Sequence, residues 1–124
     1  MVNFYYLLRC LECGHFCINY LLKKDKIKRK VVYNRQMMSF YLVKKVLEEY
    51  YKVTCFRCGN ISQIKQRCLT LVRVKNKWLH YVVIERVSED YVYYYNPVFL
   101  NIKKSKKSSF LKKWTYVGCF CEKK

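Results

Sequence analysis

The chain has 124 residues, of which 26 are Lys or Arg and only eight are Asp or Glu, so its formal net charge is +18. This length suits one domain with a modest core, and the charge implies an acidic partner such as nucleic acid, an anionic membrane face or an acidic peptide. Arg9 and Glu12 interrupt the apolar start, which argues against a secretory signal, and no run approaches the roughly 20 apolar residues of a membrane span. We therefore expect a reducing cytoplasm, where the eight cysteines serve catalysis, metal binding or packing rather than disulfides.

The first predicted elements are two helices. Apolar residues recur at helical spacing from Gly14 to Lys24, and lysines occupy the C-terminal end, as the helix dipole favours. The basic stretch KKDKIKRK that follows is typical of a solvated connection. A second helix is predicted from Ser39 to about Lys52, with Ser39 as its N-cap.

After Gly59 the pattern changes from helices to strands. Val, Ile and Tyr dominate three segments separated by short polar turns, which predicts an antiparallel meander over Leu69–Val74, Leu79–Val87 and Tyr91–Tyr95. A basic loop with one helical turn is expected from Phe99 to Lys113, and a final strand from Thr115 to Cys121. Helices followed by strands indicate an α+β fold. No Gly/Ser-rich linker divides the chain, so we expect a single domain over residues 1–124.

A cysteine stands at the start of the first predicted helix, in the sequence Glu12-Cys13-Gly14. The partial positive charge and the backbone N–H groups of a helix N-terminus favour a thiolate and can later hold an oxyanion. Gly14 is expected to leave room for a substrate backbone beside the sulfur. The alternative interpretation of Cys13 is a buried structural thiol.

Two residues of the strand region can complete a catalytic site with Cys13. His80 opens the second strand of the meander, where its ring can reach a facing helix end. Asn96, which precedes Pro97 at the end of the third strand, can accept the Nδ1 proton of a neighbouring imidazole, as the third member of a Cys-His-Asn set does. Taken singly, His80 is typical of an ordinary, partly buried histidine, and Asn96 before Pro97 is typical of a turn. Together with Cys13, in this order, they favour a cysteine peptidase.

The run Glu12-Cys13-Gly14-His15-Phe16-Cys17 resembles the Asp-Cys-Gly-x-x-Cys signature of the double-glycine leader peptidase family. His80-Tyr81-Val82-Val83-Ile84 is similar to the histidine strand of that family, and Asn96-Pro97 stands where the family usually has Asp-Pro. Phe110 and the segment Trp114-Thr115-Tyr116-Val117-Gly118 are similar to the aromatic segment that closes the family's domain. The resemblance covers nearly the whole chain, with a thin middle between about Lys24 and Gln66.

The resemblance implies a papain-like cysteine peptidase fold, with N-terminal helices packed on an antiparallel sheet and with Cys13, His80 and Asn96 as catalytic residues. The family supplies the cytoplasmic N-terminal domain of bacteriocin-exporting ABC transporters, and it cleaves after a Gly-Gly pair that ends an amphipathic, often acidic leader helix. We therefore expect a leader peptidase of peptide or bacteriocin export, which needs no cofactor. Its expected partners are an acidic leader peptide and a peptide-exporting ABC transporter at the cytoplasmic face of the membrane, and not nucleic acid.

Two positions depart from the family pattern. The family carries a Gln six residues before the nucleophile, where it donates to the oxyanion, and here that position is Leu7. Loss of one such donor typically costs about 10²–10³ in turnover, and Arg9 is the nearby candidate for a replacement. Asn96 in place of Asp gives up the negative charge that stabilises an imidazolium. A slow peptidase, or a binding domain that has kept part of a catalytic site, is therefore expected.

A zinc site is the alternative interpretation of the cysteines. Two CxxC pairs, each followed by Gly, occur at Cys10/Cys13 and Cys55/Cys58, and four such thiolates make a closed tetrahedral site. With a basic, Tyr-rich remainder, they would indicate a zinc-ribbon protein that binds nucleic acid. However, the 41 residues between the pairs exceed the usual spacing of a zinc ribbon, and zinc leaves His80 unexplained. Zinc at Cys13 would also exclude catalysis there.

Overall fold

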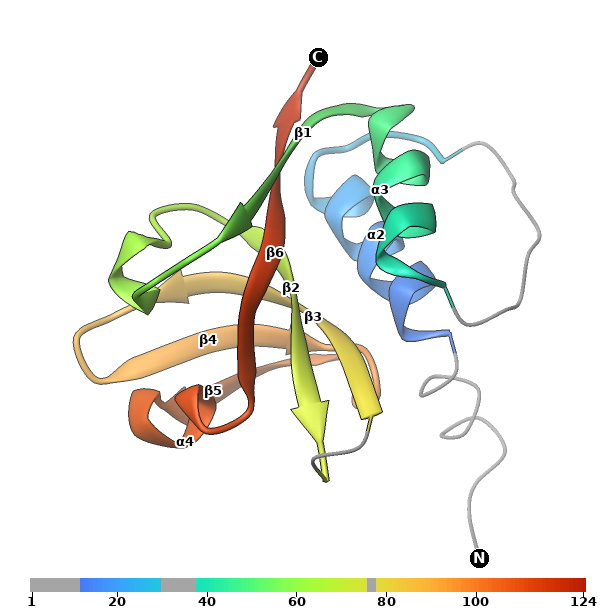
Figure 1. The fold of residues 1–124 in the computed structure, drawn as a ribbon. Helices are drawn as coiled ribbons and strands as arrows, with labels where there is room; N and C mark the ends of the chain where they lie inside the picture. Colours follow the sequence, from blue (N-terminus) through green and yellow to red (C-terminus); the bar gives the residue numbers. More distant parts are fainter. Residues whose placement is uncertain (1–11, 30–37, 76–77) are drawn as a thin grey trace, which may run out of the picture.

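The structure, a computed structural model, describes residues 12–29, 38–75 and 78–124 (Figure 1). Three residues that carry interpretations of the sequence, Leu7, Arg9 and Cys10, lie outside the described residues. The elements in chain order are α2 (Cys13–Lys24), α3 (Phe40–Glu48), β1 (Tyr51–Arg57), the 3₁₀ turn η1 (Ile61–Gln63), β2 (Cys68–Val74), β3 (Trp78–Val87), β4 (Tyr91–Asn96), β5 (Asn101–Lys106), α4 (Lys107–Leu111) and β6 (Trp114–Lys123).

The six strands form one antiparallel sheet in the order β1-β6-β2-β3-β4-β5. The neighbours β2, β3 and β4 confirm the predicted meander. The last strand, β6, lies between β1 and β2, so the C-terminal segment joins the first strand to the meander. Helices α2 and α3 lie together on one side of the sheet, as Figure 1 shows. The predicted α+β architecture, with N-terminal helices on an antiparallel sheet, is therefore present.

Both predicted helices form, but not all of their ends lie where they were predicted. Helix α2 begins at Cys13, one residue before the predicted start, and ends at Lys24 as predicted. The side chain of Ser39 accepts a hydrogen bond from the Leu42 N–H (3.2 Å), which confirms the predicted N-cap of α3. The predicted C-terminus of this helix is wrong, because α3 ends at Glu48 and the chain enters β1 at Tyr51.

Two strands were not predicted, and both are edges of the sheet. β1 has the sequence YKVTCFR and β5 has NIKKSK, and most of their residues are exposed. An exposed strand lacks the regular alternation of buried and exposed residues that marks a strand in a sequence. Lysines on an edge strand also discourage pairing with other chains. The segment predicted as a basic loop is therefore β5 followed by the short helix α4.

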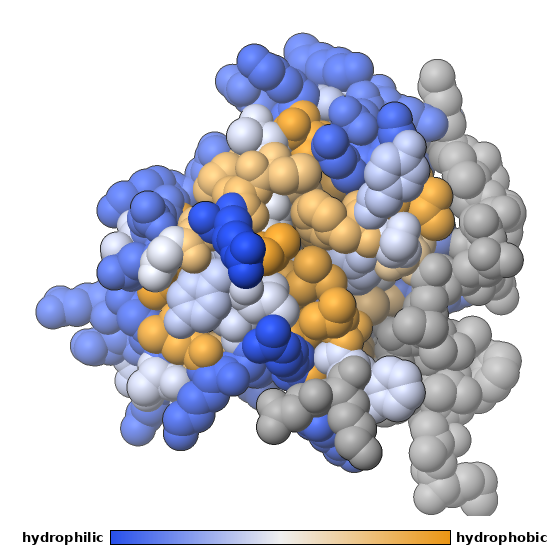
Figure 2. Space-filling model, viewed as in Figure 1, coloured by the Kyte–Doolittle hydropathy of each residue, from blue (hydrophilic) through white to orange (hydrophobic). Residues whose placement is uncertain are grey.

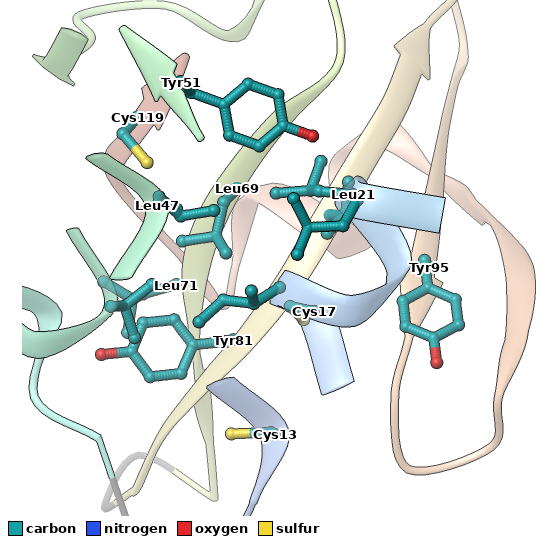
Figure 3. Packing of buried hydrophobic residues seen from close by; sticks show 14 residues of the cluster. Cys13, Cys17, Leu21, Leu47, Tyr51, Leu69, Leu71, Tyr81, Tyr95 and Cys119 are labelled. Atoms are coloured by element: carbon teal, nitrogen blue, oxygen red, sulfur yellow. The ribbon is translucent and has the colours of Figure 1, made fainter. Parts of the chain in front are cut away.

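The sheet is buried on both faces. One core lies between the sheet and the helices α2 and α3, and Figure 3 shows Cys17, Leu21 and Leu47 of these helices beside Leu69 and Leu71 of β2. The second core, on the other face, is built around Phe110 of α4 and Trp114 of β6. The Trp114 Nε1–H donates to Thr70 Oγ1 (2.8 Å), and the same hydroxyl donates to the Val117 carbonyl (2.6 Å). The polar groups of these two buried side chains are therefore paired. On the face seen in Figure 2, apolar side chains gather in the middle and hydrophilic ones surround them.

At Gly118 of β6 the neighbouring strands leave no room for a side chain, so replacing this glycine tests the register of β6. A Cβ there would lie 2.2 Å from the Leu69 carbonyl oxygen and 2.7 Å from Phe56 Cζ, which the rigid sheet backbone cannot relieve. We expect Gly118→Ala to lower the free energy of unfolding by about 1–3 kcal/mol or more, measured by urea denaturation.

Gly59→Ala is the matched control, because a Cβ at Gly59 meets nothing within 4 Å and neither glycine has a positive φ. This variant should unfold at the same urea concentration as the parent, or slightly higher, because alanine restricts the unfolded chain. Equal stability of both variants would contradict the described packing of β6 on β2.

Candidate active site

Cys13 is the first residue of α2, and its side chain is only 6% exposed. The first helical hydrogen bond runs from the Phe16 N–H to the Glu12 carbonyl (3.1 Å), so the thiol lies at the positive end of the helix dipole. Figure 3 shows Cys13, Cys17 and Leu21 following one another along α2, above the strands. Burial raises the pKa of the Cys17 thiol well above its ordinary value, which makes Cys17 a structural thiol. Cys13 therefore stands at a helix N-terminus as predicted, within the core cluster, and its role as a nucleophile stays a prediction.

Gly14 is packed against α3 in the structure, so its lack of a side chain has a structural reason besides the predicted room for a substrate. A Cβ at Gly14 would lie 3.2 Å from Cγ2 of Val43 and 3.4 Å from Cβ of Met38. Gly14 therefore lets α3 and the residue before its cap pack closely on the first turn of α2. Met38 is also tied to the sheet, because the Tyr81 hydroxyl of β3 donates a hydrogen bond to the Met38 carbonyl (2.9 Å).

His80 and Asn96 are brought together from neighbouring strands. His80 Nε2 lies 3.0 Å from Asn96 Oδ1, and the Val98 N–H donates to the same oxygen (3.1 Å). An amide oxygen only accepts hydrogen bonds, so Nε2 carries the proton of the imidazole. The predicted partner atom, Nδ1, is therefore wrong. Nδ1 is the nitrogen that remains to take a proton from a nucleophile.

The strand register places His80 on the face of β3 that Val82 and Ile84 turn toward the second core. His80 stands opposite Val72 of β2, whereas the ladder between β3 and β4 begins only at Val83. The ring thus lies before that ladder, beside the turn that follows Asn96. The next residue, Tyr81, belongs to the core that contains Cys13, and the nearby thiol contributes to a raised Tyr81 pKa. Cys13 therefore packs beside the neighbour of His80, and direct contact between Cys13 Sγ and His80 Nδ1 stays a prediction.

His80 is held in its neutral form. Burial lowers its pKa from the ordinary value of 6.5, and the positive charge of Lys113 lowers it further, while the hydrogen bond to Asn96 acts in the opposite direction. A neutral imidazole with its proton on Nε2 presents an unprotonated Nδ1. This is the protonation state that a general base requires at neutral pH.

The cysteines of the zinc interpretation are dispersed in the part of the chain that the structure describes. Cys13 is the buried first residue of α2, and Cys55 is exposed on the edge strand β1, opposite the buried Cys119. Cys58 follows β1 and packs with the core of the opposite sheet face. No three His, Cys, Asp or Glu side chains of residues 12–29, 38–75 and 78–124 form a group that could hold a metal ion. Cys13, Cys55 and Cys58 therefore share no site, and Cys10 lies outside the described residues.

A groove of about 620 Å³ runs along α2 from Phe16, one turn after Cys13. Tyr20 and Tyr95 are stacked at its base, with ring centroids 4.0 Å apart and an interplanar angle of 9°. Its other lining residues come from α2, from the connection between β4 and β5, and from the start of β5: Asn19, Lys23, Lys24, Leu100, Asn101 and Ile102. Sequence patterns could not reveal this groove, because its two walls are about 80 residues apart in the chain. Its apolar base and lysine rim suit an amphipathic acidic peptide.

The protonation of His80 can be tested directly. We expect NMR titration to place the His80 pKa below 6.5, with Lys113→Gln raising it and Asn96→Ala lowering it further. Because the folded-state pKa is depressed, the neutral ring contributes stability above the unfolded-state pKa, and this contribution is lost as the pH falls through the folded-state pKa. His15, the second histidine, is assigned with His15→Gln. An unchanged His80 pKa in both Lys113→Gln and Asn96→Ala would contradict the described surroundings.

Comparison with known proteins agrees with this fold. The model of the peptidase C39 family matches residues 8–124, and no curated protein matches the chain. One similar solved structure is the peptidase domain of Streptococcus ComA, described as a bifunctional ABC transporter involved in a quorum sensing pathway. It has 14% identity and a TM-score of 0.64, over 86% of this chain and 78% of that one. The peptidase domain of Streptococcus mutans ComA has 10% identity and a TM-score of 0.68, over 98% and 94% of the two chains.

The same Streptococcus mutans domain in complex with a small-molecule inhibitor gives 12% identity and a TM-score of 0.68, over 98% and 94% of the two chains. At these identities the likeness shows the fold, with helices on an antiparallel sheet as in the papain-like peptidase domains. The family model covers nearly the whole chain, including the segments of Cys13, His80 and Asn96. The chain therefore belongs to the peptidase C39 family of cysteine peptidases.

Proposed function

We propose that this chain is a cysteine endopeptidase that trims leader peptides after a Gly-Gly pair during peptide or bacteriocin export. Cys13 is its nucleophile, His80 its general base and Asn96 the residue that orients the imidazole. The observation that carries the proposal is the His80 Nε2–Asn96 Oδ1 hydrogen bond of 3.0 Å, in a chain whose Cys13 begins helix α2. It fixes the tautomer that a cysteine peptidase needs.

The mechanism follows from the proton positions. His80 Nδ1 takes the Cys13 proton, and the thiolate attacks the carbonyl carbon of the second glycine. The imidazolium then protonates the leaving amine as the C–N bond breaks, which leaves a thioester on Cys13. Water, deprotonated by His80, hydrolyses this thioester and restores the thiol. The amide of Asn96 holds Nε2–H through the cycle but brings no negative charge to the imidazolium.

The oxyanion of each tetrahedral intermediate needs donors near the thiol. The backbone N–H of Cys13, at the start of α2, is the first donor, and the helix dipole adds to its effect. Leu7 replaces the second donor of the family pattern. One missing donor typically costs about 10²–10³ in turnover, so we expect a slow enzyme rather than a fast one.

The substrate is inferred from the groove beside Cys13. A leader helix with one apolar and one acidic face can place its apolar side on Tyr20 and Tyr95 and its acidic side near Lys23 and Lys24. The net charge of +18 strengthens this attraction at a distance. The peptidase domains of similar fold belong to ComA, an ABC transporter. A peptide-exporting transporter at the cytoplasmic face of the membrane is therefore the expected partner.

Cleavage of a synthetic acidic leader that ends in Gly-Gly is the direct test of the proposal. With enzyme in excess over peptide, the parent should release the leader slowly, and Cys13→Ala should release none, because the nucleophilic sulfur is gone. Product formation is followed by mass spectrometry, which also locates the cleaved bond.

Cys17→Ala is the control, since Cys17 is a fully buried thiol one turn further along the same helix. It should retain the parent rate of cleavage. Undiminished cleavage by Cys13→Ala would overturn the catalytic assignment. Tight leader binding without cleavage by the parent protein would instead show an inactive relative that only holds its substrate.

The groove is tested by reversing its charge. We expect Lys23→Glu/Lys24→Glu to weaken leader binding by roughly three- to tenfold, since exposed charges each contribute little, with the rate of the bound peptide unchanged. Fluorescence anisotropy of a labelled leader measures the affinity, which should also fall as salt is raised.

Lys123→Glu/Lys124→Glu makes the same change of charge at the C-terminal end of β6, outside the groove lining. If both double variants weakened binding equally, overall charge rather than the groove would attract the leader. An affinity independent of salt would remove the electrostatic explanation altogether.

A further inference from the structure

The strongly exposed apolar side chains of the described residues gather at one end of the molecule. We call this the site end: α2, α3, β3 and β5 begin there, and β2 and β4 end there, in the lower part of Figure 1. The side chains in question are Tyr41, Leu42, Val74, Trp78, Leu79, Phe99, Leu100 and Ile102, which are 40–64% exposed. Leu100 and Ile102 line the groove already described. The others need a different explanation.

Three of these side chains form an apolar tip, which consists of Trp78, Leu79 and Phe99. Their exposures are 62%, 60% and 57%. Trp78 and Leu79 open β3, and Phe99 follows the end of the antiparallel neighbour β4, so the three stand at adjacent strand ends. An exposed cluster of a Trp, a Leu and a Phe is uncommon on the surface of a monomer, and it marks a surface that meets an apolar partner.

The charges of the molecule are distributed unevenly about the same end. Arg73, Lys75 and Lys112 are exposed there, and the Arg73 N–H donates to the carbonyl of Lys113 (2.7 Å), which joins the two basic segments. Seven of the eight acidic residues of the chain lie elsewhere. They are found at the C-terminal ends of α2 and α3 (Asp25, Glu48, Glu49), in β3 and the hairpin after it (Glu85, Glu89, Asp90), and near the C-terminus (Glu122). The eighth, Glu12, is half-buried. The site end therefore combines exposed apolar groups with an almost unopposed positive charge.

One residue in each of the two connections next to the apolar tip has an unfavourable backbone conformation. Lys75, in the connection between β2 and β3, has φ of 53°, and Leu100, in the connection between β4 and β5, has φ of 55°. Residues other than glycine rarely adopt this left-handed region, and such strain is characteristic of functional segments. Both residues flank the apolar tip, and Lys26 and Tyr116, which lie away from it, also have positive φ, so the strain alone does not mark the tip.

We propose that the site end docks on the surface of an anionic phospholipid bilayer. Trp78, Leu79 and Phe99 enter the boundary between headgroups and acyl chains, and Arg73, Lys75 and Lys112 contact the phosphates. The bases of a nucleic acid can stack on Trp78 and Phe99, but they offer no comparable partner to the aliphatic Leu79, whereas the acyl boundary accepts all three. No described helix is long and apolar enough to span a bilayer, so docking is peripheral. The proposal does not depend on the catalytic roles of Cys13 and His80.

The two tryptophans of the chain provide a built-in probe. Trp78 is 62% exposed and Trp114 is 2% exposed, so a change in emission on binding reports mainly on Trp78. The full chain is mixed with vesicles of phosphatidylglycerol and phosphatidylcholine, or of phosphatidylcholine alone. We expect binding to the anionic vesicles only, with a shift of emission to shorter wavelength and quenching by brominated lipid.

Variants separate the apolar tip from general charge. Leu79→Ser/Phe99→Ser should lower the partition coefficient at least tenfold, and Arg73→Gln/Lys75→Gln should lower it more than Lys123→Gln/Lys124→Gln, the matched pair at the far end of β6. Trp78→Phe should bind but lose the spectral change. Circular dichroism confirms that each variant is folded.

The proposal is overturned if anionic vesicles do not bind the parent chain. It is also overturned if Leu79→Ser/Phe99→Ser binds like the parent, or if binding leaves the Trp78 emission unchanged, since charge alone would then explain the association. Equal binding to pure phosphatidylcholine would overturn the role given to Arg73, Lys75 and Lys112.

Discussion

The burial of β3 on both of its faces is the constraint on which the other features depend. Tyr81 and Val83 face the core under α2, whereas Val82 and Ile84 face the core around Phe110 and Trp114. A one-residue slip of this strand would exchange the two sets and disrupt both cores at once. The register of β3 therefore fixes where its first residues lie: His80 shares the face of Val82 and Ile84, and its neighbour Tyr81 faces the helix of Cys13.

The candidate site depends on this register in two ways. Pairing of β3 with β4 brings the His80 ring and the Asn96 amide within hydrogen-bonding distance. Tyr81, the next residue of β3, packs in the core that also contains Cys13 of α2. Burial keeps the imidazole neutral, and the helix end provides the positive potential that a thiolate needs. The proposed chemistry thus depends on the same contacts as the packing of β3.

The sequence predicts the parts of the fold that carry strong periodicity. α2, the Ser39 cap, the meander and the last strand follow from helical spacing, capping and runs of Val, Ile and Tyr. β1 and β5 escape prediction because most of their residues are exposed: in YKVTCFR only Tyr51 is fully buried, and in NIKKSK no residue is. For the site, residue types and order indicate Cys13, His80 and Asn96, but the imidazole nitrogen that meets Asn96, the role of Gly14 and the groove beside α2 depend on tertiary contacts.

The hydrogen bonds of Asn96 have a consequence for which residues this position tolerates. Its Oδ1 accepts from both His80 Nε2–H and the Val98 N–H, so the fold requires an acceptor at this point. A carboxylate meets the same geometric requirement, which makes amide and acid interchangeable as far as the architecture is concerned. Evolution can therefore adjust the charge beside the imidazole without rebuilding the strand end, because folding and reactivity are governed by different properties of one side chain.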